Sequence, residues 1–230
     1  MDNAQIETLK PTDSLEVLPI KTKRILVSGP KGGIGKTTLS RNIGVAAALH
    51  GLRVATLDLD PQRSLTLWYG KRPDEMTEIA HFQAGMVPED IREALAGIDG
   101  YDLLVIDTPP SIEDYPEVFK MLIVATDLAI IPTGQSSDDV DIVLPWMAFM
   151  RRFGVNAWYV LNRVKPRTRG FTEAQGKLLK AGRICAVELP DYEDVQFSAS
   201  RGLGLLELRN AKGGEHITGI WSFVAQELGF

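Results

Sequence analysis

A glycine-rich segment at residues 30–38, Pro-Lys-Gly-Gly-Ile-Gly-Lys-Thr-Thr, follows directly on the apolar residues 25–27. Glycines let backbone N–H groups converge on phosphate oxygens, and a helix that starts in the segment adds the positive end of its dipole. In a loop of this kind Lys36 reaches the β- and γ-phosphates, and the Thr37 hydroxyl is placed to ligate Mg²⁺. The segment therefore predicts a nucleotide-binding loop made of Lys31, Gly32, Gly33, Ile34, Gly35, Lys36, Thr37 and Thr38.

Two residues of this loop depart from its usual pattern. Pro30 stands where a glycine is normal, and Lys31 is a second lysine near the start of the loop. Taken alone, Lys31 is typical of a solvated loop lysine, so its interpretation depends on the motifs around it.

Two aspartates, Asp58 and Asp60, follow the apolar run at residues 54–57. Residues two apart on an extended strand share one side, so both carboxylates point into the same crevice. One could hold the water shell of a metal while the other orients an attacking water. The Asp-Pro pair at 60–61 is also typical of a plain turn. A phosphate loop in the same chain favours the chemical interpretation.

A third aspartate, Asp107, ends the apolar run at residues 103–106 and is followed by Thr-Pro-Pro. An apolar strand that ends in an aspartate is typical of the metal-side carboxylate of phosphate-loop ATPases, which approaches Mg²⁺ directly or through water. A helix N-cap or a turn is the structural alternative. Together with the other two motifs, Asp107 predicts a Mg²⁺ site.

The elements that must position these motifs follow from the hydrophobic pattern. Six nearly continuous apolar runs, as expected of parallel strands covered on both faces, lie at 25–27, 54–57, 103–106, 128–131, 158–161 and 184–187. Helical patterns lie between and after them, at 37–49, 88–97, 115–125, 138–153, 172–181 and 212–228. The alternation predicts an α/β fold with a doubly wound, mostly parallel sheet flanked by helices.

Composition bounds the class of protein. The 230 residues are 44% hydrophobic and 24% charged, which is ordinary for a globular protein. Residues 1–22 carry two prolines and no clear periodicity, so we expect a flexible N-terminal arm before a single domain at 23–230. The lone Cys185 lies in an apolar run, which predicts a core thiol and excludes a disulfide framework within the chain. With no secretory signal and no apolar stretch that could span a bilayer, we expect a cytoplasmic protein.

These motifs resemble those of the ParA/MinD family of deviant-loop ATPases, and within it the small partition ParA proteins. The resemblance covers roughly residues 23–228. It rests on the segments 31–38, 58–62 and 105–110, and on residues 64–66 and Trp68, which follow the second segment. It implies ATP or ADP and Mg²⁺ as cofactors, with Thr37, Asp58 and Asp107 on the metal side. It also implies a homodimer that closes over ATP, in which Lys31 reaches the nucleotide of the partner.

The same resemblance implies an activity and its residues. The protein would be a slow ATP hydrolase, stimulated by a ParB-like or other cargo-borne activator, with Lys31, Lys36 and Asp60 as catalytic residues. Asp60 would position the hydrolytic water. Asn162 matches a position that reads adenine in relatives, and Pro190 lies in the matching adenine-side loop.

Charge is unevenly distributed along the chain. The net charge is −5, yet residues 151–183 contain nine Lys or Arg and one acid, so this segment is +8 and the rest is −13. Non-specific DNA binding needs such cations facing phosphates, and the family resemblance implies a nucleoid-associated state when ATP is bound. The DNA-binding candidates are Lys165, Arg167, Arg169, Lys177, Lys180 and Arg183; a solvated charged surface is the alternative. Acids at 191–194, where relatives often carry a basic residue, argue against DNA contact at that loop.

Two other functions stay open at this point. A membrane-associated positioning ATPase of the MinD type would need a basic amphipathic helix at the C-terminus, and residues 217–230 have an apolar face but no lysine or arginine. This segment therefore predicts a core-packing helix, and membrane binding is not expected. A small-molecule ligase or kinase on the same fold is the second alternative.

Overall fold

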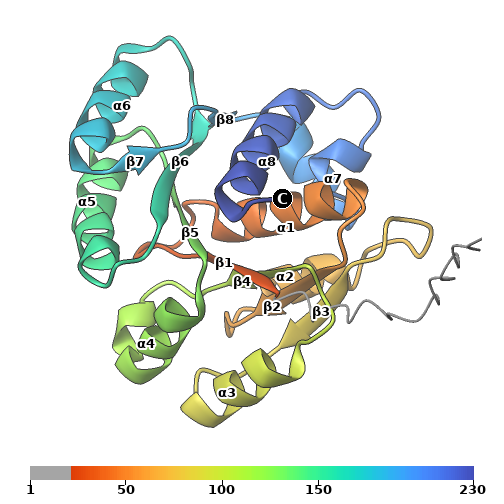
Figure 1. The fold of residues 1–230 in the computed structure, drawn as a ribbon. Helices are drawn as coiled ribbons and strands as arrows, with labels where there is room; N and C mark the ends of the chain where they lie inside the picture. The colour runs from red at the N-terminus through yellow and green to blue at the C-terminus, as the bar shows by residue number, and fades with distance from the viewer. Residues whose placement is uncertain (1–21) are drawn as a thin grey trace, which may run out of the picture.

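The computed structural model describes residues 22–230, so the predicted arm at residues 1–22 lies, except for Thr22, outside the described residues. One sheet runs through the molecule in the order β3-β2-β4-β1-β5-β6-β7, with β8 paired to β6 (Figure 1). Every pairing is parallel. Its strands are β1 (Lys23–Val27), β2 (Val54–Asp58), β3 (Ala80–Gln83), β4 (Leu103–Asp107), β5 (Leu128–Thr133), β6 (Ala157–Val164), β7 (Arg183–Ile184) and β8 (Leu189–Pro190).

Helices cover both faces of this sheet. Their bounds are α1 (Lys36–Leu49), α2 (Ser64–Tyr69), α3 (Pro88–Gly97), α4 (Pro116–Ala125), α5 (Ser137–Arg152), α6 (Arg169–Ala181), α7 (Glu193–Ser200) and α8 (Gly214–Leu228), with short 3₁₀ turns η1 (Ile112–Asp114) and η2 (Leu205–Glu207). Alternate residues of β1 supply two cores: Ile25 and Val27 pack with α1 and α8, and Leu26 packs with α3 to α6. The predicted doubly wound α/β fold is confirmed, and the described sheet is entirely parallel.

Strand register brings the predicted motifs to one edge. In the parallel alignment Val27, the last residue of β1, lies beside Asp107 of β4, and Asp107 lies beside Asp58 of β2. The phosphate loop leaves β1 at this carboxyl edge, where ligands of open α/β sheets bind. The sequence's three motifs therefore meet at adjacent strand ends.

The structure adds elements that the hydrophobic pattern did not reveal. Strand β3 is half-exposed at the edge of the sheet, and β8 is two residues long and includes a proline, so neither forms an apolar run. Helices α2 and α7 are short. The strand predicted at 184–187 is wrong in extent, because β7 ends at Ile184 and the chain then leaves the sheet after one more hydrogen bond, from Cys185 N to Tyr159 O.

Two smaller expectations are settled by packing. Cys185 is buried, and burial raises the pKa of its thiol to about 11, so it is a core thiol as predicted. The apolar face of α8, including Ile217, Ile220 and Trp221, is buried in the core that contains α1. This confirms a core-packing helix. Within residues 22–230, no helix combines the length and apolar character needed to cross a membrane.

Candidate nucleotide site

The phosphate loop bends into α1 through glycines in the left-handed region. Gly33 has φ +77° and Gly35, the N-cap of α1, has φ +97°. A Cβ on Gly35 would lie 1.8 Å from Nδ2 of Asn162, so both the backbone angle and the space require glycine here. No side chain caps the start of α1. The backbone N–H groups of its first turn are therefore free to bind an anion.

Lys36 is held inside the loop that it serves. Its Nζ donates to the carbonyl oxygens of Lys31 at 3.0 Å and Gly29 at 3.5 Å. Burial lowers the pKa of Lys36, while the nearby Asp107 and Asp60 carboxylates oppose that shift. The ammonium thus sits where phosphate oxygens would replace the loop carbonyls as its partners.

Asp107 lies at the floor of the site and is fully buried. Its carboxylate accepts hydrogen bonds from Thr37 Oγ1 at 2.7 Å and from Ser40 Oγ at 2.9 Å, so the first turn of α1 is tied to the end of β4. Burial raises the pKa of Asp107 to about 7, and the Asp58 carboxylate adds to this shift. A cation bound here would favour the ionised form.

Asp58 is oriented by a chain of polar side chains. Its Oδ2 accepts from the backbone N and the Oγ1 of Thr66, at 2.9 and 2.8 Å. Thr66 Oγ1 lies 2.9 Å from Nε2 of His81, whose Nδ1 lies 2.9 Å from Thr56 Oγ1. Burial lowers the pKa of His81, which favours a neutral ring. The chain holds Asp58 against the start of α2.

Asp60 begins the turn between β2 and α2. Its backbone N donates to Asp58 Oδ1 at 3.0 Å, and its own Oδ1 accepts from Gln62 N at 2.9 Å. The turn interpretation of this aspartate is therefore right as local structure. Asp60 also lines the cleft above the phosphate loop, where a carboxylate could orient a water.

A cleft of about 610 Å³ extends from the loop to α7. The predicted residues that line it are Gly32, Gly33, Gly35, Lys36, Thr37, Thr38, Asp60, Asn162 and Pro190. Ile34 is buried beneath the loop, and its carbonyl accepts from Asn162 Nδ2 at 2.9 Å. The buried Asn162 Oδ1 accepts no hydrogen bond from any described residue. The cleft is large enough for a nucleotide, and it places Asn162 and Pro190 in one space with the phosphate loop.

Oxygen donors suit the predicted Mg²⁺ as well. Thr37, Asp58 and Asp107 offer a hydroxyl and carboxylates, which are the ligands that this hard cation prefers. Across residues 22–230, no three acidic, histidine or cysteine side chains form a self-sufficient metal site. Mg²⁺ is usually held by one or two carboxylates together with substrate phosphates and water.

Lys31 points to its own subunit in this single chain. Its Nζ forms an ion pair with Asp139 Oδ1 at 2.8 Å, near the start of α5. The hydrogen bond to Asp139 raises the pKa of Lys31. Burial opposes ionisation of Asp139, but hydrogen bonds from Lys31 and Ser136 hold the pKa of that carboxyl below its ordinary value. The role of Lys31 across a dimer stays a prediction.

Sequence reasoning assigned no role in this site to Arg41, His81 and Asp139, and it noted Thr66 only as part of the segment that follows Asp60. Arg41 lines the cleft and donates from Nη2 to the Val195 carbonyl at 3.1 Å, and burial lowers its pKa to about 10. Its spacing of four residues from Thr37 places it on the same helix face, so periodicity could have found it. His81 contacts Thr66 across 15 positions, and Asp139 contacts Lys31 across 108, so neither residue carries a local sequence signal.

A second hollow, of about 730 Å³, lies beside the same strand ends. It is lined by the end of β2, by the end of β3 and by α3, and its polar walls include Asp58, Asp60, Asp90, Glu93 and Arg63. Asp58 and Asp60 thus stand next to a space that the sequence did not predict.

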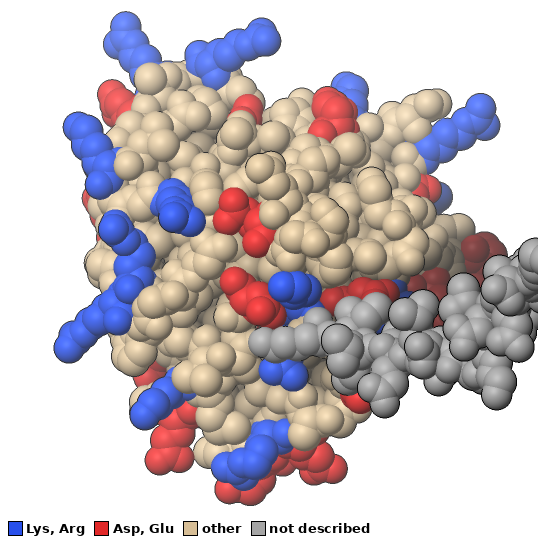
Figure 2. Space-filling view, viewed as in Figure 1, with Lys and Arg blue, Asp and Glu red and all other residues tan. Residues whose placement is uncertain are grey.

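The six DNA-binding candidates lie on α6 or close to it in the sequence. Lys165 and Arg167 precede α6, Arg169 begins it, and Arg183 follows it in β7. All six are exposed, although Lys177 pairs with Asp141 at 3.3 Å. Figure 2 shows Lys and Arg gathered along the edge where Figure 1 places α5 and α6. α6 rises about 20 Å, so these residues form a stripe rather than a single cluster.

The acidic loop at 191–194 lies elsewhere. It enters α7, where Glu193 and Asp194 occupy the first turn and favour the helix dipole. Asp191 and Tyr192 line the nucleotide cleft, and Asp191 lies 3.9 Å from the Arg163 guanidinium. Asp191 therefore has a local ionic partner beside the cleft, and Glu193 and Asp194 stabilise the start of α7.

Comparisons with known proteins place this chain in a family and show which proteins share its fold. The family described as the "CobQ/CobB/MinD/ParA nucleotide binding domain" matches residues 25–206. The curated "Maintenance of carboxysome distribution protein A" of Gloeobacter kilaueensis is 30% identical over 209 residues, or 89% of this chain and 93% of that protein. The "Chromosome-partitioning ATPase Soj" of Thermus thermophilus is 32% identical over 124 residues, or 42% of this chain and 49% of that protein.

Solved structures share the fold at lower identity. A putative plasmid partition protein from Borrelia burgdorferi, bound to AMPPNP, superposes with a TM-score of 0.75 at 16% identity, covering 90% of this chain and 100% of that one. The MinD cell division protein of Aquifex aeolicus superposes with a TM-score of 0.73 at 20% identity, covering 89% and 98%. Both are similar to this chain in their architecture.

Proposed function

Since this chain belongs to the CobQ/CobB/MinD/ParA family of nucleotide-binding domains, we propose that it is a slow ATPase that dimerises over ATP and positions a cargo of DNA or a protein assembly. Named relatives maintain carboxysome distribution or partition chromosomes, which supports a positioning role. The observation that carries the proposal is the junction of the phosphate loop with Asp107, where Thr37 Oγ1 donates at 2.7 Å.

Hydrolysis needs charge neutralisation and in-line placement of water more than covalent help. Lys36 and the amides at the start of α1 hold the phosphate oxygens, and Asp60 orients the attacking water. Thr37, Asp58 and Asp107 hold Mg²⁺, which supplies positive charge to the phosphates. Asn162 Oδ1 is available to accept a hydrogen bond from the exocyclic amine of adenine.

Lys31 links turnover to dimerisation in this proposal. Its ion pair with Asp139 is exposed to solvent on the Lys31 side, so it can be exchanged for a phosphate of the partner subunit. In the resulting dimer each nucleotide contacts a second lysine, Lys31 of the other copy. Hydrolysis removes the phosphate that this lysine contacts, and the dimer is weakened. A ParB-like or other cargo-borne activator would then act by improving the geometry of the site.

The dimer is tested by light scattering of the purified protein with Mg²⁺ and a non-hydrolysable ATP analogue. We expect dimers with the unmodified chain and with Lys120→Ala, an exposed lysine on α4. We expect monomers and no turnover with Lys31→Ala, and stalled dimers that bind ATP with Asp60→Ala. A Lys31→Ala protein with normal dimers and turnover would contradict the cross-subunit role.

DNA binding is proposed for the exposed stripe along α6. Lys180 and Arg183 lie near its end, and neither forms an ion pair with an acid within the described residues. We expect ATP-dependent, salt-sensitive retention of random-sequence duplex, weakened by Lys180→Glu with Arg183→Glu and unchanged by Lys120→Glu. If the protein retains DNA in this way, it would be a cytoplasmic protein that associates with the nucleoid when ATP is bound. No retention at low salt would remove this part of the proposal.

One observation favours a second candidate function. The hollow of about 730 Å³ beside Asp60 gives room for a small second substrate, as a ligase or kinase needs. Turnover stimulated by a metabolite, and not by a protein or DNA, would favour this alternative. The membrane-associated alternative has no comparable support, because the apolar face of α8 is committed to the core.

A further inference from the structure

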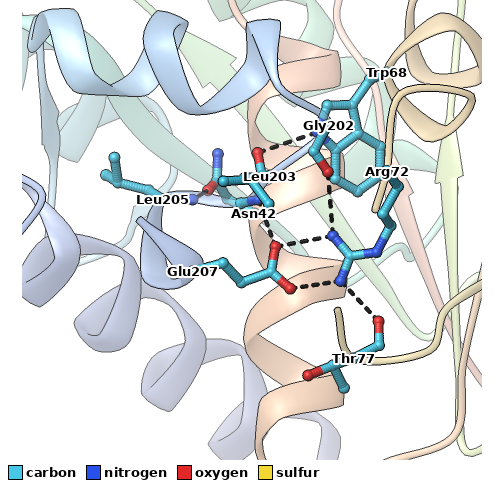
Figure 3. Close-up of polar contacts among 9 residues, drawn as sticks. Asn42, Trp68, Arg72, Thr77, Gly202, Leu203, Leu205 and Glu207 are labelled. Atoms are coloured by element: carbon cyan, nitrogen blue, oxygen red, sulfur yellow. Dashed lines mark hydrogen bonds and ion pairs between the residues drawn. The ribbon is translucent and has the colours of Figure 1, made fainter. Parts of the chain in front are cut away.

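A buried polar network joins the end of α2 and the turn after it, which carries Arg72, to the segment 202–207, which follows α7 and ends in η2 (Figure 3). The guanidinium of Arg72 faces the carboxylate of Glu207, with Nη1 donating to Oε2 at 2.8 Å and Nη2 to Oε1 at 2.5 Å. Nη1 also donates to the Gly202 carbonyl at 3.3 Å, and Nη2 to the Thr77 carbonyl at 2.7 Å. Glu207 Oε2 in turn accepts from Gly204 N at 2.8 Å. The fork of Arg72 is matched on both of its outer nitrogens.

The Arg72–Glu207 pair is buried, and the backbone around it is closely packed. The Arg72 and Glu207 side chains are 6% and 4% exposed. A Cβ on Gly202, which has φ +72°, would lie 2.4 Å from the backbone of Lys71, and one on Gly204 would lie 2.7 Å from Val45. The segment at 202–207 is thus pressed against the end of α2 and against α1. A buried ion pair is weak evidence for added stability, but the loss of one partner leaves an uncompensated buried charge.

The segment 202–207 also forms hydrogen bonds with two helices that line the nucleotide cleft, α1 and α2. Trp68 of α2 donates from Nε1 to the Leu203 carbonyl at 3.1 Å, and the Arg72 guanidinium lies 5.5 Å from the centre of its ring. Asn42 of α1 accepts from Leu205 N at 2.7 Å and donates to the Thr38 carbonyl at 2.8 Å. One short loop therefore contacts the helix of the phosphate loop and the helix after Asp60.

We propose that Arg72 and Glu207 form a positioning pair for ATP hydrolysis. They touch no reacting atom. They hold α2, and through it the turn that carries Asp60, at a fixed distance from α7 and the phosphate loop. Ser64 and Trp68 of α2 line the cleft opposite residues of α7, so a shift of α2 moves this wall and the Asp60 turn. This inference rests on the proposed ATPase function.

The position of the pair decides what its loss changes. Nucleotide affinity depends mainly on the phosphate loop, and no hydrogen bond links that described segment to the Arg72 or Glu207 side chain. The rate of hydrolysis depends on the placement of water by Asp60, and a misplacement of about 1 Å can cost roughly a hundredfold in rate. Loosening the pair should therefore lower kcat far more than it raises the dissociation constant for ATP.

The test uses the full-length chain and compares substitutions in two arginine–carboxylate pairs. Arg72→Lys and Glu207→Gln keep the size of the side chain but break the charged fork. Arg53→Lys controls for the substitution itself. Arg53 forms a two-point pair with Asp102, at 2.8 and 3.1 Å, which is more exposed than the Arg72 pair and lies just before β2 and β4, at the opposite end of the strands. Each variant is assayed for kcat, for binding of a fluorescent ATP analogue and for its urea midpoint.

We expect Arg72→Lys and Glu207→Gln to lower kcat at least about tenfold, with the dissociation constant for the analogue changed less than about threefold. The control should stay within about twofold in both. Variants that unfold at lower urea but keep the normal kcat would overturn the proposal, since a purely stabilising pair behaves in that way.

A measurement on the unmodified protein covers the case of variants that do not fold. Amide hydrogen exchange of residues 64–72 and 202–207 should slow together when a non-hydrolysable ATP analogue and Mg²⁺ are added. Independent responses of the two segments would overturn the positioning role. An unmodified protein that binds the analogue without any ATPase activity would contradict the proposed function, and the exchange result would still judge the link between the two segments.

Discussion

Asp107 should make the nucleotide-free protein less stable as pH rises. Burial raises its pKa from the ordinary 3.8 to about 7, so the folded protein keeps a proton that the unfolded chain releases above about pH 4. The free energy of unfolding therefore falls with pH until the folded carboxyl also ionises. The difference in pKa corresponds to roughly 4 kcal/mol in all, of which about 2 kcal/mol is lost between about pH 5.5 and about pH 8.

Urea unfolding in EDTA, followed by tryptophan fluorescence, measures this loss in the unmodified protein and in Asp107→Asn. The difference between the two isolates Asp107, because all other titrating groups are shared. One of these is His81, whose lowered pKa makes stability rise with pH. We expect the unmodified protein to lose about 2 kcal/mol relative to the variant over this range.

The reasoning is refuted if the difference between the two proteins is the same at both pH values to within about 0.5 kcal/mol. Asp107 would then ionise at its ordinary pKa despite its burial. Addition of Mg²⁺ and ADP supplies a second check. A cation near the carboxylate favours its ionised form, so the pH dependence should shrink when both are bound.

Three further substitutions probe the site and its support. Gly35→Ala places a Cβ against Asn162 at φ +97°, so it should cost about 1–3 kcal/mol in unfolding free energy and sharply weaken nucleotide binding in a titration. Thr66→Val removes the hydroxyl that bonds Asp58 at 2.8 Å, and it should cost about 1–3 kcal/mol and lower ATPase activity; unchanged turnover would deny the orienting role. Ile220→Ala empties a fully packed position of α8 and should cost about 2–5 kcal/mol by urea unfolding, while nucleotide affinity stays near normal.

The centre of this fold was predictable because its signals are local. Each central strand is a continuous apolar run, and each predicted helix has a clear face, so five strands and six helices were found within a few residues. The edge was less predictable. Ala80–Gln83 is half-exposed and needs no apolar run, and Leu189–Pro190 pairs only through Asn162 and Val164 of β6. Each of these strands forms by pairing with the backbone N–H and C=O groups of a neighbouring strand, β2 for β3 and β6 for β8.

The candidate site divides in the same way. The loop, Asp58, Asp60 and Asp107 could be read from spacing, because adjacent strand ends bring such motifs together without further information. The ion pair of Lys31 with Asp139 spans 108 positions, and that of Arg72 with Glu207 spans 135. No periodicity or local motif encodes such pairs. They depend on how α5 and η2 pack against the rest of the fold.

The two outermost strands of the sheet are short: β3 has four residues and β7 has two. A long, flat edge would invite another chain to add a strand, and such an attachment is hard to reverse. Short edge strands make strand addition unfavourable, so the carboxyl edge of the sheet is the better surface for contact between two copies. In the proposed function, association at this edge depends on ATP, which is then hydrolysed. Assembly of two copies would therefore be reversible and could be repeated.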